Sequence, residues 1–98
     1  MIYFYGFFVI WQKLALKIRR MIKQVNLYST SHCHLCELAH SLLMSFSDDI
    51  ALKIIDIAED EKLLDKFSLR IPVLQRLDTQ AELNWPFSAV DINNFLKT

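Results

Sequence analysis

Hydrophobic and polar positions recur with two different periodicities along the chain. Residues 25–28 alternate between apolar and polar side chains, and residues 51–57 are rich in isoleucine, so each segment predicts a β-strand. Between them, apolar residues recur at spacings of three and four, which is typical of an amphipathic helix. The side chains that this spacing places on the buried face are Leu35, Leu38, Ala39, Leu42, Leu43 and Phe46.

The segment after the second predicted strand has the pattern of a short helix. Asp60 is a suitable N-cap. The apolar side chains that follow it on one helical face are Leu63, Leu64 and Phe67. The helix is expected to end near residues 68–69, because the residue before Pro72 is driven away from helical geometry.

The last third of the chain predicts two strands and a helix. Residues 71–74 start a third strand, residues 78–80 form a turn, and alternation over residues 81–85 predicts a fourth strand. Ser88 and Asp91 have the spacing of a capping box. The helix that they open carries the apolar residues Val90, Ile92, Phe95 and Leu96. Strand–helix–strand–helix–strand–strand–helix indicates an α/β domain.

The first residues of the chain do not fit this pattern. Residues 1–11 are almost wholly apolar, but they are too few to span a bilayer, which takes about 20 residues. We divide the chain into a helical N-terminal extension, residues 1–21, and a domain, residues 22–98. Three interpretations of the extension stay open: an over-long translation with Met21 as the natural start, a membrane-surface or signal-anchor helix, and a helix covering an apolar patch. Membrane contact is expected only through residues 1–20.

The two parts of the chain carry opposite charge, although the 98 residues sum to zero. Residues 1–24 contain five basic residues and no acidic one, whereas the remaining 74 residues contain six basic and eleven acidic residues, a net charge of −5. An acidic domain argues against nucleic acid as a partner. Two cysteines are too few for a disulfide framework, so a reducing, cytoplasmic location is expected.

Both cysteines lie where the first predicted strand meets the first predicted helix. A Cys-x-x-Cys at a strand-to-helix turn is typical of a redox dithiol. If the helix begins at or just after Cys33, its sulfur faces unpaired N–H groups and the positive helix end, which favour the reactive thiolate. Cys36 lies one turn further along, so we assign Cys33 as the nucleophile and Cys36 as the resolving thiol. His32 and His34 flank Cys33, and His34 is either a group that tunes the thiolate or a plain exposed residue.

A metal site is the main alternative to redox chemistry. The candidate ligands near the turn are His32, Cys33, His34, Cys36 and His40. A Cys-x-x-Cys at a helix start presents only two sulfurs, and His40 lies roughly 10 Å along the helix axis from Cys33. A closed four-ligand site is therefore hard to build within one chain, which leaves a dimer sharing one ion as the metal-binding arrangement.

A fairly specific combination is formed by residues 27–36 (Leu-Tyr-Ser-Thr-Ser-His-Cys-His-Leu-Cys), 71–74 (Ile-Pro-Val-Leu) and 84–87 (Asn-Trp-Pro-Phe). Together they resemble the short bacterial glutaredoxin-like proteins of the thioredoxin superfamily. The resemblance implies a four-stranded mixed sheet flanked by three helices and a cis bond between Ile71 and Pro72. It also implies that the Ile71 N–H and C=O pair with the backbone of a bound peptide or of glutathione.

Two departures from that family bear on glutathione. Ordinary glutaredoxins have Cys-Pro-Tyr-Cys where this chain has Cys-His-Leu-Cys, and they have a paired-glycine segment before the last helix. Residues 85–88 contain no glycine, so close backbone approach to glutathione is not expected there. Arg70 is a candidate for steering an anionic ligand, and glutathione or a protein partner could each act as the reductant.

The sequence therefore predicts a monomeric thiol–disulfide oxidoreductase that reduces protein or glutathione-mixed disulfides. The expected catalytic residues are Cys33 and Cys36. The expected substrate-binding residues are His34, Arg70, Ile71 and Pro72. No bound cofactor or metal is expected, and glutathione is a candidate reductant. The alternative is a non-enzymatic metal-binding or redox-sensing module on the same scaffold.

Overall fold

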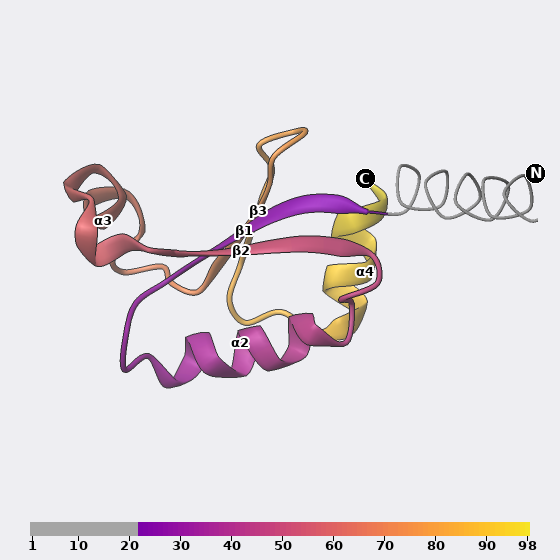
Figure 1. The fold of residues 1–98 in the computed structure, drawn as a ribbon, viewed down its shortest axis with the longest axis horizontal. Coiled ribbons are helices and arrows are strands. Elements are labelled where there is room, and N and C mark those ends of the chain that lie inside the picture. The colour runs from indigo at the N-terminus through magenta and orange to yellow at the C-terminus, as the bar shows by residue number, and fades with distance from the viewer. Residues whose placement is uncertain (1–21) are drawn as a thin grey trace, which may run out of the picture.

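The computed structural model describes residues 22–98 (Figure 1). Its elements are β1 (Lys23–Ser29), α2 (His34–Met44), β2 (Ile50–Asp56), the short 3-10 helix η1 (Ile57–Glu59), α3 (Glu61–Phe67), β3 (Val73–Arg76), β4 (Glu82–Asn84) and α4 (Ala89–Lys97). The predicted order is confirmed, and η1 is an added element. The helical extension expected over residues 1–21 lies outside the described residues. Among the helices described, none is both long and apolar enough to cross a membrane.

The four strands form one mixed sheet in the order β2-β1-β3-β4. β1 pairs in parallel with β2, which the intervening helix permits, and β3 runs antiparallel to both β1 and β4. This is the α/β sheet that the resemblance implied. Because Tyr28 pairs with Val73, the end of β1 lies beside the start of β3. The loop with the cysteines and the loop with Pro72 therefore leave the sheet at the same end.

Side chains of the sheet alternate between two separate apolar layers. On one face, α2 and α4 cover Leu27 and Leu74, which are fully buried. On the other face, α3 covers Tyr28 and Val73, and the Phe67 ring stacks on Tyr28 with the ring centroids 4.3 Å apart. Figure 1 shows α2 and α4 close together and α3 at the end of the sheet away from α4.

The buried face of α2 differs from the predicted one. The spacing places Leu35 and Leu38 on that face, but they are 46% and 45% exposed. The buried side chains are Cys36, Ala39 and Leu43, which also recur at helical spacing. The prediction is confirmed for Ala39 and Leu43 and was wrong for Leu35 and Leu38, because the helix is rotated about its axis so that Cys36 faces the sheet in their place. This rotation shields Cys36.

The ends of α3 and α4 follow their predicted caps. Asp60 accepts hydrogen bonds from the first turn of α3, and that helix ends at Phe67. At α4, Ser88 Oγ accepts from the Asp91 N–H at 3.2 Å, and Asp91 Oδ2 accepts from the Ser88 N–H at 2.9 Å, so the capping box is confirmed. The buried side chains of α4 are Ile92 and Phe95, whereas Val90 is 67% exposed.

Candidate active site

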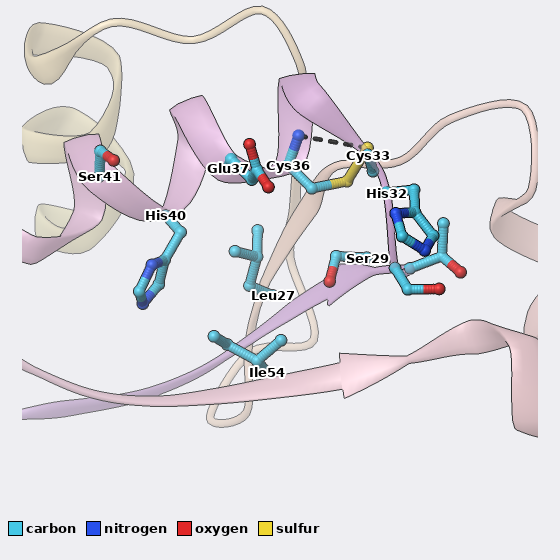
Figure 2. A pocket seen from close by; sticks show the side chains of 11 residues that line it. Leu27, Ser29, His32, Cys33, Cys36, Glu37, His40, Ser41 and Ile54 are labelled. Atoms are coloured by element: carbon cyan, nitrogen blue, oxygen red, sulfur yellow. Dashed lines mark hydrogen bonds between the residues drawn. A yellow bond between two sulfur atoms is a disulfide. The ribbon is translucent and has the colours of Figure 1, made fainter.

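Cys33 is the N-cap of α2 (Figure 2). Its backbone is extended, and its Sγ accepts a hydrogen bond from the backbone N–H of Cys36 at 3.2 Å. The sulfur thus takes the place that a serine or aspartate oxygen commonly takes at a helix start. A thiolate in this place is stabilised by that N–H and by the helix dipole. The predicted position of Cys33 at the helix start is confirmed.

Cys33 and Cys36 form a disulfide, with their Cα atoms 5.2 Å apart. Cys33 is half-buried, whereas Cys36 is only 5% exposed because it faces the sheet. An incoming sulfur therefore reaches Cys33 more easily than Cys36. This difference in access fits the roles assigned from the sequence, in which Cys33 is attacked and Cys36 resolves.

The turn before α2 contains a left-handed residue. His32 has φ 58°, a region that costs a non-glycine residue about 1–2 kcal/mol because Cβ approaches the backbone carbonyl. Histidine occupies this region more often than most residues do. The turn carries the chain from Ser29 at the end of β1 to Cys33, so that α2 begins directly at the reactive sulfur.

An open cleft of about 300 Å³ lies beside the disulfide (Figure 2). Its α2 side includes Cys36 and His40, and its sheet side includes Leu27 and Ile54, which pair across β1 and β2. The His40 side chain is half-buried. Sequence reasoning missed the cleft because β2 supplies Ile54 from a distant segment; the spacing of four between Cys36 and His40 was the available signal.

His34 lies on the solvent side of α2. Its side chain is 80% exposed, and its Nδ1 is 3.9 Å from Oε2 of Glu37. It is not among the residues that line the cleft beside the disulfide. Its role in tuning the thiolate stays a prediction.

Arg70 lies between α3 and β4 and already has partners. Its Nη2 donates to Glu82 Oε1 at 2.6 Å and to Asn84 Oδ1 at 2.8 Å, and its guanidinium lies 5.1 Å from the Phe67 ring centroid. The hydrogen bond from Arg70 holds the pKa of Glu82 below its ordinary value. The positive charge that was expected to steer an anionic ligand is therefore compensated by Glu82.

Pro72 directly precedes β3 and is fully buried. The peptide bond between Ile71 and Pro72 is cis. The Ile71 N–H donates to the Phe67 carbonyl at 3.0 Å. This contact differs from the expectation that the N–H pairs with a substrate backbone, because the end of α3 already uses it. A peptide could pair with this N–H only by displacing that bond, so the Ile71 carbonyl is the better candidate.

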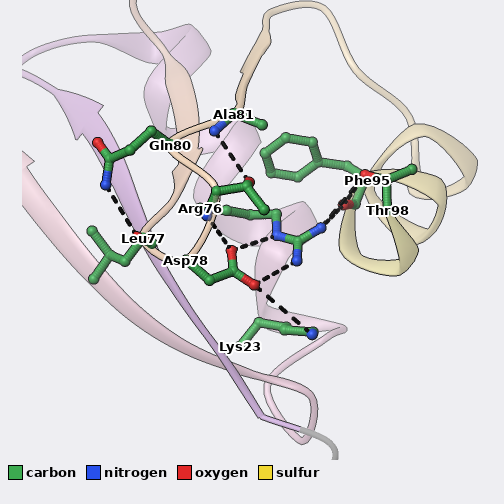
Figure 3. A network of polar contacts seen from close by, with 9 residues as sticks. Lys23, Arg76, Leu77, Asp78, Gln80, Ala81, Phe95 and Thr98 are labelled. Atoms are coloured by element: carbon green, nitrogen blue, oxygen red, sulfur yellow. Dashed lines mark hydrogen bonds and ion pairs between the residues drawn. The ribbon is translucent and has the colours of Figure 1, made fainter.

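A second set of charged contacts lies where β1 begins and β3 ends, at the end of the sheet opposite the disulfide. Figure 3 shows these contacts. There Arg76 is buried and donates to both carboxylate oxygens of Asp78, at 2.9 and 2.6 Å, and to the Phe95 carbonyl at 2.9 Å. We call these three residues the Arg76 clamp. The guanidinium hydrogen bonds hold the pKa of Asp78 below its ordinary value. Lys23 Nζ lies 3.9 Å from the same carboxylate.

The structure does not gather the candidate metal ligands. Within residues 22–98, no three histidine, cysteine, aspartate or glutamate side chains are placed to hold one ion. His34 and His40 lie at different places on α2, one exposed and one in the cleft. The site therefore offers sulfur exchange chemistry through two cysteines, with an imidazole nearby.

A family model for the glutaredoxin-like domain (DUF836) matches residues 24–97. The chain belongs to this family. Apart from Lys23 at the start of β1, the match covers the seven α-helices and β-strands described here and both cysteines, and it confirms the resemblance to this family. No protein with a curated description matches the chain.

Solved structures of similar chains agree with this assignment. The X-ray structure of target protein XcR50 from X. campestris is 33% identical, with a TM-score of 0.68; the match covers 74% of this chain and 95% of that chain. The solution structure of protein Ne2328 from Nitrosomonas europaea is 25% identical, with a TM-score of 0.66, over 74% of this chain and 89% of that chain. Both matches support the four-stranded, three-helix fold.

Proposed function

We propose that this glutaredoxin-like chain is a thiol–disulfide oxidoreductase that reduces protein or glutathione-mixed disulfides. One observation carries the proposal: the half-buried Cys33 caps α2 through its sulfur and lies within bonding reach of the buried Cys36. Two cysteines with a purely structural role would not require one sulfur to be accessible and to lie at a helix N-terminus. That position favours the thiolate, which is the species that attacks disulfides.

The proposed cycle has two exchanges. The Cys33 thiolate attacks the substrate disulfide, forms a mixed disulfide and releases the first substrate thiolate. Cys36 then loses its proton and attacks Cys33, which forms the bridge described above and releases the second substrate sulfur as a thiolate. An external thiol reopens the bridge. No other cofactor takes part, and a reducing compartment such as the cytoplasm supplies the thiol.

The segment before α4 bears on whether glutathione is that thiol. Glutathione carries carboxylates, which helix N-termini attract through free N–H groups. At the start of α4, the Asp91 side chain accepts a hydrogen bond from the Ser88 N–H, and the Ser88 side chain accepts one from the Asp91 N–H. These two N–H groups are therefore already paired. The acidic Asp91 also opposes an approaching carboxylate. We therefore favour a protein disulfide as the substrate and leave the reductant to experiment.

A glutathione redox titration tests the proposal. The full chain is equilibrated at graded ratios of reduced to oxidised glutathione, the free thiols are alkylated, and intact mass is read. We expect a reversible two-electron transition with one midpoint, which is lost in Cys33→Ser. A persistent glutathione adduct on Cys33 would identify glutathione as a working partner. Thiols that never oxidise, or that react only after a chelator is added, would contradict the proposal and favour the metal-binding alternative.

A further inference from the structure

The cleft beside the disulfide connects the buried Cys36 with the imidazole of His40. The two residues lie one turn apart on α2, and residues at this spacing have Cβ atoms about 5–6 Å apart. Figure 2 shows the His40 ring on the side of α2 that faces the strands, whereas the Cys36 sulfur points along the helix toward Cys33. Because both side chains line the same open cleft, water in that cleft can connect the imidazole with the Cys36 sulfur.

Cys36 must lose its proton in order to attack, and the hydrogen bond that stabilises the Cys33 sulfur does not help it to do so. Cys36 is only 5% exposed, and burial in apolar surroundings disfavours its thiolate. The N–H that stabilises the other sulfur belongs to Cys36 itself and points to Cys33. A thiol in this position becomes a nucleophile when a nearby base takes its proton during the attack.

We propose that the neutral His40 imidazole accepts the Cys36 proton, through cleft water, as Cys36 attacks the mixed disulfide. The Cys33–Cys36 bond forms, the bond between Cys33 and the substrate sulfur breaks, and the substrate leaves as a thiolate. When a reductant thiolate later attacks Cys33, Cys36 leaves and takes the proton back from the imidazolium. The inference rests on the proposed function and adds a proton path to it.

Among the titratable side chains that line the cleft, His40 is the one suited to accept the Cys36 proton. The other titratable residues of the cleft are His32, Cys33 and Glu37. β1 and β2 contribute side chains that do not titrate near neutral pH, namely Leu27, Ser29 and Ile54. The groove that continues past His40 along α2 and β2 is mainly apolar, with Leu43, Met44, Ile50 and Leu52. Glu37 borders the cleft but is exposed, and its Oε2 lies 3.9 Å from Nδ1 of His34.

Stopped-flow mixing with a chromophoric aromatic disulfide separates the two exchanges. The reduced full chain is mixed with an excess of the disulfide, and release of the aromatic thiolate is followed. The first phase reports attack by Cys33 and depends on disulfide concentration. The second phase reports attack by Cys36 and does not depend on it. Cys36→Ser should lack the second phase, which confirms its origin.

The pH dependence of the second phase in the unsubstituted chain is the first test. With His40 as the base, the rate should rise with pH and level off once the imidazole is neutral, and His40→Gln should remove this inflection. If Cys36 instead ionises without help, the rate should keep rising toward the ordinary thiol range, about pH 8.5. The second result overturns the inference, whatever the variants do.

Variants at His40 give the second test. His40→Gln should slow the second phase about tenfold or more near pH 7 and leave the first phase within about twofold. His40→Glu should restore part of the rate and move the levelling-off to lower pH, which a merely structural role would not do. Glu37→Gln is the matched control from the same cleft and should keep the inflection where it is.

The outcomes separate this inference from the proposed function. A missing first phase would contradict the oxidoreductase itself. A first phase followed by a second phase that His40→Gln leaves unchanged would contradict only the role of His40. A loss of the inflection in Glu37→Gln would assign the proton to that carboxylate instead. Thermal unfolding of each variant shows that the chain remains folded.

Discussion

The two ends of the sheet are built by opposite means. At one end, the Arg76 clamp buries a charge and satisfies it with three short hydrogen bonds between β3, the following turn and α4. At the other end, a half-buried sulfur caps a helix with one hydrogen bond and lies beside an open cleft. The difference indicates that stability is concentrated away from the chemistry. Changes at one end should therefore leave the other nearly unaffected.

The largest effect is expected at the reactive end. Cys33→Ser should reduce disulfide exchange on the order of a thousandfold or more, because the attacking sulfur is lost. Cys36→Ser should instead accumulate mixed disulfides on Cys33, visible by intact mass. Turnover of a model disulfide measures the first result, and thermal unfolding of the reduced proteins serves as the control. Mixed disulfides that accumulated equally in Cys33→Ser and Cys36→Ser would contradict the division of roles between the sulfurs.

A large effect on stability is expected at the other end. Arg76→Met removes the donor to the Phe95 carbonyl and to Asp78, and should cost about 2–4 kcal/mol of unfolding free energy. Urea unfolding measures this loss. Lys23→Met is the matched control, because its exposed 3.9 Å contact with the same carboxylate should contribute less than about 1 kcal/mol. If Arg76→Met also changed the alkylation rate of Cys33 severalfold in the folded protein, the two ends would not be independent.

Much of the fold could be predicted because its signals are local. The capping residues Asp60 and Ser88 predicted the starts of two helices, and the spacing of apolar residues predicted the order of the elements. The exact face of α2 could not be predicted, since Leu35 and Leu38 fit a buried stripe with Ala39 as well as Cys36 does. The choice between them depends on how closely the helix packs on the sheet, and local spacing does not contain that distance.

The reactive sulfur was predictable and its surroundings were not. The Cys-x-x-Cys spacing and a helix start at residue 34 are both present in the sequence, and the cap at Cys33 follows from them. Arg70 and the Ile71 N–H were expected to face a ligand, but they bind Glu82 and the Phe67 carbonyl. These contacts join segments up to 12 residues apart and depend on how α3, β3 and β4 meet.

An intermediate effect is expected from pH at the Arg76 clamp. The pKa of Asp78 is lowered in the folded protein below its ordinary value of 3.8, chiefly by the hydrogen bonds from Arg76. The stability that this pair contributes is therefore fully present above the unfolded-state pKa and is lost as pH falls through the lower folded-state pKa. Urea unfolding at graded acidic pH should show wild type and Asp78→Asn converging at the lowest pH. A constant difference between them would contradict the assignment.

The smallest effect is expected from His34, which the sequence left as either a tuning group or a plain exposed residue. Its side chain is 80% exposed, so water and salt screen its charge from the Cys33 sulfur. His34→Gln should change the rate of Cys33 alkylation less than about twofold at any pH, since exposed charge pairs contribute about 0–1 kcal/mol. Alkylation is measured with and without added salt. A larger, salt-sensitive decrease below the imidazole range would show that His34 tunes the thiolate, and the helix start alone would then not account for the reactivity of Cys33.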